Sequence, residues 1–148
     1  MTDHTPLDTE AVALWMADHI KGFQGPVSAI KFTLGQSNPT YALTAPSGRY
    51  VLRRKPPGIL LKSAHAVERE FRVQNALSGS AVPVAKMYKL CEDTSIIGSA
   101  FYVMDMIDGV TYNEPHLPHL ARDKRRPIII EMNRVLGAIH NVDLSATG

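Results

Sequence analysis

The sequence predicts an α+β fold: a five-stranded antiparallel sheet with one helix inserted after the third strand. Two observations carry this prediction. Five short segments have the composition and alternation of strands, and turn residues join neighbouring segments as hairpins. Helical periodicity separates the third strand from the fourth. The chain has 148 residues, 45% hydrophobic and 20% charged, which is ordinary for one globular domain with its own core.

The first predicted element is an amphipathic helix over about residues 8–20. Asp8 or Thr9 is its candidate N-cap, and glycines and a proline after residue 21 end it. Apolar and aromatic positions recur at spacings of three and four, which gives the helix one buried face. The residues of that face are Val12, Trp15, Met16, His19 and Ile20.

Three strands follow, over residues 27–34, 40–45 and 50–54. Pro46-Ser47-Gly48 is a tight-turn signal between the second and third strands. Because strand side chains alternate between faces, Arg53 projects from one face of the third strand and Arg54 from the other.

The next segment predicts a helix over residues 63–78, with Ser63 as candidate N-cap and Gly79 just past its end. Strands over 84–90 and 100–107 come after it. Cys91 closes the first of these strands and is more typical of a small core residue than of a nucleophile. A proline-containing linker then leads to a helix over residues 122–140.

Charge and composition exclude several classes of protein. The net charge of +2 argues against a nucleic-acid partner, and no apolar run approaches the length of a membrane span. The single cysteine and the absence of a secretory signal pattern favour the cytoplasm. His116 and His119 lack further ligands for a metal site. A basic cluster at 122–126 is typical of a solvated helix face.

Three segments could carry chemistry. In the loop over residues 32–41, Gly35 permits a close turn, and Ser37 and Asn38 can present a hydroxyl and amides to a phosphate. Arg53 can hold phosphate oxygens and would need a partner such as Glu70 on the next helix. The strand that ends near Asp108-Gly109 exposes backbone groups that a purine could use. Each segment, taken alone, is equally compatible with an ordinary turn, an edge strand or a core strand.

Taken in order, these segments resemble the small lobe of a kinase of the aminoglycoside phosphotransferase and choline-kinase-like family. The nearest resemblance is to phosphotransferase-like proteins related to the domain that precedes some acyl-CoA dehydrogenases. It covers about residues 25–148. The segments that carry it are 35–41, 51–58, 63–73, 82–84, 101–104, 108–109 and 136–143.

The resemblance implies a role for each matching residue. Gly35, Ser37 and Asn38 would lie in the nucleotide-covering loop. Arg53 stands where the family carries a phosphate-binding lysine, a departure, and Glu70 would be its partner on the helix. Lys55 is the reserve cation. The Asp105 carbonyl and the Ile107 amide would face adenine at the hinge, with little role for their side chains.

The family's catalytic His-Gly-Asp segment, its following Asn and its later metal-binding Asp are absent from the sequence. His140-Asn141-Val142-Asp143 does not replace them, because its spacing differs and the family's catalytic segment lies further along. We therefore expect no catalytic residue and no metal ligand in this chain. ATP or GTP with magnesium would serve the complete enzyme, and this chain would hold nucleotide weakly.

The implied organisation is an N-terminal helix at 1–22, a small lobe at 23–108, and a hinge exit with the first large-lobe helices at 109–148. The implied function is the nucleotide-binding lobe of an ATP- or GTP-dependent small-molecule O-phosphotransferase, truncated before its catalytic loop. The alternative is a non-catalytic interaction module that keeps a kinase-lobe fold. We expect self-association through an apolar stripe on the last helix. That stripe consists of Ile128, Met132, Val135, Leu136 and Ile139.

Overall fold

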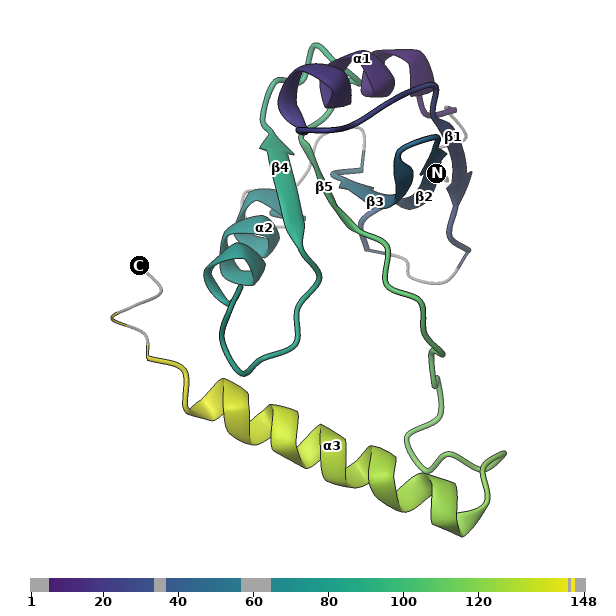
Figure 1. Ribbon diagram of the computed structural model, residues 1–148, viewed down its shortest axis with the longest axis vertical. Coiled ribbons are helices and arrows are strands. Elements are labelled where there is room, and N and C mark those ends of the chain that lie inside the picture. The colour runs from purple at the N-terminus through teal and green to yellow at the C-terminus, as the bar shows by residue number, and fades with distance from the viewer. Residues whose placement is uncertain (1–5, 34–36, 57–64, 144, 146–148) are drawn as a thin grey trace.

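The structure, a computed structural model, describes residues 6–33, 37–56, 65–143 and 145. Helix α1 covers one face of an antiparallel sheet and helix α2 the other, and a long helix α3 follows an extended linker (Figure 1). The elements are α1 (Thr9–His19), β1 (Ser28–Lys31), β2 (Thr40–Ala45), β3 (Gly48–Arg54), α2 (Val67–Ala76), β4 (Met87–Cys91), β5 (Phe101–Asp105) and α3 (Arg122–His140).

The predicted five-stranded antiparallel sheet with an inserted helix is confirmed, in the strand order β1-β2-β3-β5-β4. A two-residue turn joins β2 to β3 between the paired residues Ala45 and Gly48. Gly48 has a φ of 140°, which only glycine adopts readily, so the predicted turn depends on it. Because β5 lies between β3 and β4, residues from three separate chain segments meet in the middle of the sheet.

The face of the sheet under α1 carries the larger apolar core. Trp15 meets Phe101 edge-to-face, with ring centroids 4.8 Å apart. Asp8 is the N-cap of α1, since its side chain accepts a 2.9 Å hydrogen bond from the Ala11 amide. The predicted buried face of α1 is correct except at His19, which is exposed and stacks on Trp15 instead of entering the core.

The boundaries of α2 differ from the prediction. The helix begins at Val67 after an N-cap at Ala66 that makes no side-chain hydrogen bond. His65 has a φ of 59°, outside the helical region, so the helix cannot extend back to residue 63. Ser63, the predicted cap, lies outside the described residues, and the N-cap position is occupied by Ala66. Residue Gly79 does adopt the left-handed conformation predicted past the helix end, with a φ of 81°.

Three strands are shorter than predicted, or shifted. β1 ends at Lys31, and the candidate position Leu34 falls outside the described residues. β4 begins at Met87 rather than 84, since its register with β5 starts there. β5 ends at Asp105, whose amide donates to the Lys86 carbonyl at 2.8 Å. Cys91 is buried at the end of β4, as predicted for a core residue.

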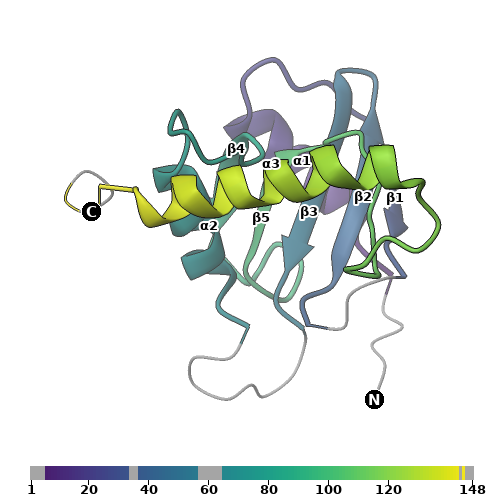
Figure 2. The same cartoon turned by 90° about the horizontal axis from the view of Figure 1, so that it is seen from below.

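Helix α3 spans the predicted residues but stands apart from the three layers (Figures 1 and 2). None of its residues is buried. A hydrogen bond of 3.5 Å from Arg134 Nη1 to the Ala81 carbonyl links it to the segment after α2. Within the described residues no helix is both long and apolar enough to cross a membrane. The large exposed apolar side chains of α3 are Ile129, Ile130, Met132, Leu136 and Ile139.

We propose that the isolated chain self-associates by pairing α3 with α3 of a second copy. Burying one large apolar side chain is worth about 1.5–3 kcal/mol, and a closed two-fold dimer is the commonest way to do so. Replacing Leu136 by Glu should shift the chain to monomer in sedimentation equilibrium at micromolar concentration. Replacing Asn133, an exposed polar residue of the same helix, by Glu serves as the matched control. A monomeric wild-type chain with unprotected α3 amides in hydrogen exchange contradicts the proposal.

Candidate functional site

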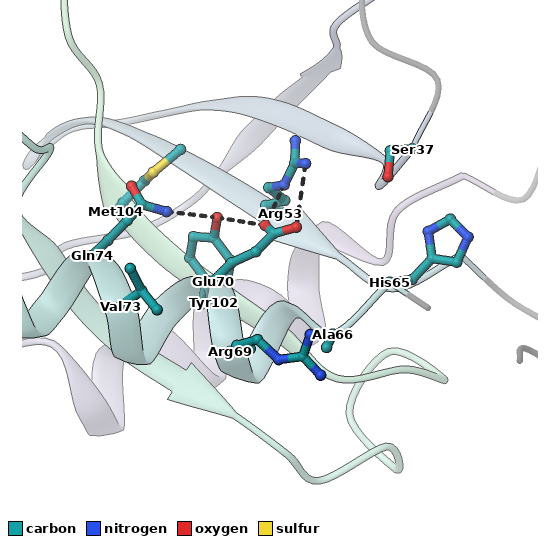
Figure 3. Close-up of a pocket in the computed structure, with 10 residues that line it drawn as sticks. All are labelled: Ser37, Arg53, His65, Ala66, Arg69, Glu70, Val73, Gln74, Tyr102 and Met104. Atoms are coloured by element: carbon teal, nitrogen blue, oxygen red, sulfur yellow. Dashed lines mark hydrogen bonds and ion pairs between the residues drawn. The ribbon is translucent and has the colours of Figure 1, made fainter. Parts of the chain in front are cut away.

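Arg53 and Glu70 form an ion pair on the face of the sheet that α2 covers (Figure 3). Arg53 lies opposite Tyr102 in the register of β3 with β5, and both side chains point toward the helix. Arg53 Nε donates to Glu70 Oε2 at 2.7 Å, and its Nη2 approaches Oε1 at 3.5 Å. The predicted approach of these two residues is therefore confirmed.

Three further groups fix this pair. Thr40 on β2 accepts a 3.0 Å hydrogen bond from Arg53 Nη1. The Asn38 amide donates to Glu70 Oε1 at 2.8 Å, and the Tyr102 hydroxyl donates to Oε2 at 3.1 Å. An ionised carboxylate only accepts hydrogen bonds, so every group that surrounds Glu70 is a donor. The carboxylate thereby joins a loop and two strands to α2.

A pocket of about 710 Å³ opens beside the ion pair (Figure 3). Arg53, His65 and Arg69 supply its basic groups, while the Glu70 carboxylate in its wall already pairs with Arg53. The pocket therefore favours an anionic ligand. Its lining residues are Ser37, Arg53, His65, Ala66, Arg69, Glu70, Val73, Gln74, Tyr102 and Met104.

The structure brings together some of the predicted site residues. Ser37 lines the pocket with Arg53 and Glu70. Asn38 does not line it: 3% of this residue is exposed, and its side chain is bonded to Glu70 and His65. Gly35 lies outside the described residues.

The two residues predicted for the hinge, Asp105 and Ile107, do not line the pocket. The Asp105 side chain accepts a 3.4 Å hydrogen bond from the Tyr88 hydroxyl, and Asp105 is absent from the pocket lining. Ile107 follows β5 and is 64% exposed. Among the described residues its amide forms no backbone hydrogen bond.

Sequence reasoning missed His65, Arg69 and Tyr102. Arg69 could have been predicted, because it directly precedes Glu70 on α2. The helical turn that directs Glu70 toward the sheet places Arg69 beside the same pocket. Tyr102 sits at an alternating position of a predicted strand, but alternation alone does not reveal its hydroxyl partner. His65 depends on a left-handed backbone before α2, for which the sequence carries no signal.

The other cations of β3, and Lys55 directly after it, also have partners. Arg49 pairs with Asp108 and Lys55 with Glu68. Burial would raise the pKa of Glu68, but the hydrogen bond and positive charge of Lys55 outweigh this effect and lower it. Arg54, 4% exposed, donates from Nε to Ser99 at 3.0 Å on the α1 face. Lys55 is thus engaged away from the pocket lining, and Arg53 is the cation of this strand that faces the pocket.

The sheet, the inserted helix and the Arg–Glu pair together define the small lobe of a kinase-like fold. The chain belongs to the phosphotransferase enzyme family, whose model matches residues 28–148. A solved structure from Ralstonia eutropha, provisionally described as an aminoglycoside phosphotransferase, superposes with a TM-score of 0.83 at 48% sequence identity. The match covers 97% of this chain and 41% of that one.

Curated relatives carry the same region within longer proteins. Acyl-CoA dehydrogenase family member 10 of Mus musculus is 50% identical over 83% of this chain. Acyl-CoA dehydrogenase family member 11 of Homo sapiens is 34% identical over 94% of it. The matched regions make up 12% and 18% of those proteins, so the chain spans less than a fifth of their length.

Tyr102 should ionise only at unusually high pH. Burial, and second the charge of Glu70, raise the pKa of Tyr102 to about 12. The unfolded value is about 10, so the folded state binds this proton more tightly, and stability should fall as pH rises from about 10 to about 12. Replacing Tyr102 by Phe should make that fall shallower in urea unfolding across this pH range. Tyr112→Phe, at an exposed tyrosine, is the control. Parallel stability curves for Tyr102→Phe and wild type would contradict the assignment.

Proposed function

We propose that this chain is the nucleotide-binding lobe of an ATP- or GTP-dependent small-molecule O-phosphotransferase. The observation that carries the proposal is the Arg53–Glu70 pair in the wall of a basic pocket, in a member of the phosphotransferase enzyme family. In kinases a cation on the third strand, paired with a glutamate of the following helix, binds nucleotide phosphates.

The donors of Arg53 suit a phosphate ligand. A guanidinium has five N–H groups. The bonds to Glu70 and Thr40 use one each on Nε, Nη1 and Nη2, so N–H groups on both terminal nitrogens remain for a ligand. These two groups can bind two phosphate oxygens at once. Arg69 and Ser37 add a second cation and a hydroxyl at the same pocket.

The end of β5 and the segment that follows it would supply the second half of the proposed site. A strand that leaves a sheet carries backbone groups without ladder partners, and a purine ring edge has matching donors and acceptors. The proposed contacts are the Asp105 carbonyl and the Ile107 amide. The exposed ion pair of Arg49 with Asp108 connects this segment to the start of β3.

The described residues of the pocket do not by themselves suit a magnesium ion. No group of three or more His, Cys, Asp or Glu side chains that could hold a metal ion occurs among the described residues. Glu70, the carboxylate of the pocket, is already bonded to Arg53, Asn38 and Tyr102. Metal ligands and the acceptor site would therefore belong to other parts of a complete enzyme.

The chain should bind ATP or GTP with magnesium weakly, with a dissociation constant of about 1 mM or higher, because part of the phosphate site is present without metal ligands. Arg69→Ala should weaken binding further in an NMR titration, while Arg72→Ala, on the same helix but outside the pocket, should not. Submicromolar affinity, or equal effects of the two variants, would show that the site is misplaced.

The isolated chain should show no phosphoryl transfer to alcohols or aminoglycosides. A general base must be placed at the acceptor hydroxyl, and the sequence lacks the His-Gly-Asp segment that would supply it. The measurement is ATP turnover in successive purification fractions, which separates activity of the chain from that of contaminating enzymes. Turnover that persists through purification and disappears in Arg53→Ala would contradict this prediction.

A further inference from the structure

Both ends of the Asn38 side chain are occupied by protein groups. The amide nitrogen lies 2.8 Å from Glu70 Oε1, which can only accept, so the oxygen end faces His65. His65 Nδ1 lies 2.9 Å from that oxygen and therefore donates to it. Asn38 is almost fully buried, so its amide links two protein groups rather than meeting a ligand.

Asn38 also closes a ring of hydrogen bonds around Arg53. Its backbone carbonyl accepts from the Thr40 hydroxyl at 3.0 Å, and Thr40 accepts from Arg53 Nη1. Arg53 donates to Glu70, and Glu70 accepts from the Asn38 amide. Every donor in this ring meets an acceptor, so the guanidinium is held along two edges.

His65 anchors this ring at the entrance of α2. It precedes the helix, lines the pocket and has a φ of 59°, a conformation uncommon for residues other than glycine. Its carbonyl accepts a 2.9 Å hydrogen bond from the Val67 amide at the first helical position. The imidazole thus joins the start of the helix to the loop that ends at β2.

We propose that Asn38 and His65 are positioning residues that hold the Glu70 carboxylate and, through it, the Arg53 guanidinium in the orientation that leaves two N–H groups for an anionic ligand. The identity of that ligand as a nucleotide phosphate rests on the proposed function. The orientation of Arg53 does not, since it follows from contacts within the chain. Asn38 therefore does not line the pocket and acts through Glu70 on Arg53.

The Nε–Hε signal of Arg53 in a ¹H–¹⁵N spectrum of the 148-residue chain tests this directly. Arg53→Lys, which removes the signal, provides its assignment. In Asn38→Leu, which keeps the shape but removes both polar ends, exchange of this hydrogen with water should accelerate about tenfold to a hundredfold, the scale of one hydrogen bond to a charged group. Asn75→Leu, at an exposed position of α2, makes the same chemical change and should leave the rate unchanged.

His65→Gly supplies a second variant in case Asn38→Leu does not fold. Glycine accepts the φ of 59° and removes the imidazole, so it releases one end of Asn38 without a core substitution. Exchange at Arg53 should accelerate about twofold to fivefold. A rate equal to wild type in a folded variant of either kind overturns the positioning role.

Titration of the same samples with ATP and magnesium separates this inference from the proposed function. Weaker binding by Asn38→Leu, with wild-type binding by Asn75→Leu, supports both. Equal ATP affinity of Arg69→Ala and Arg72→Ala, while Arg53 exchange still depends on Asn38, refutes the proposed function and leaves the positioning role supported. Unchanged ATP affinity in a variant with accelerated Arg53 exchange overturns the role of these residues in presenting Arg53 to the ligand.

Discussion

The Glu70 carboxylate is the group on which the arrangement of this lobe depends. It lies on α2, yet its donors come from the loop before β2, from β3 and from β5. A partly buried charge needs such donors. A buried charge without hydrogen bonds destabilises the fold by more than each of these bonds stabilises it. One carboxylate therefore ties α2 to the sheet, to the Arg53 guanidinium and to Asn38 before β2.

The two faces of the sheet differ in what they hold: the α1 face carries the larger apolar core, and the α2 face carries the ion pair and the pocket. The α1 face holds fully buried residues such as Met16, Leu52 and Phe101, whose packing does not require a ligand. The α2 face has a smaller apolar cluster around Val67 and Tyr102, and the ion pair lies at its edge. A polar site on that face is tolerated because the opposite face supplies the larger share of buried apolar area. Alternation along β3 links the two, since Leu52 enters one layer and Arg53 the other.

The fold was largely predictable from the sequence, and the site only in part. Alternation and turn residues predicted five strands, the inserted helix and the inward direction of Arg53, because these depend on local periodicity. The start of α2 is harder to predict, because the helix begins at Val67 after the left-handed backbone of His65, which no local pattern encodes. The loop composition predicts that Asn38 meets a ligand. It does not reveal that Glu70 and His65 form hydrogen bonds with the two ends of the Asn38 side chain. Partners 27 or more residues apart arise from tertiary packing alone.

The choice of arginine at position 53 follows from this geometry. A lysine ammonium is a compact point charge, which can pair with Glu70 or a phosphate but has no extended edge with which to span Thr40 as well. The planar guanidinium bonds Glu70 along one edge and Thr40 from the other terminal nitrogen, and still retains donors. A guanidinium is permanently charged, so its attraction for an anion does not depend on pH. A buried lysine, by contrast, can lose its proton and with it the charge. An arginine at this position thus joins the cation that faces the pocket to both β2 and α2.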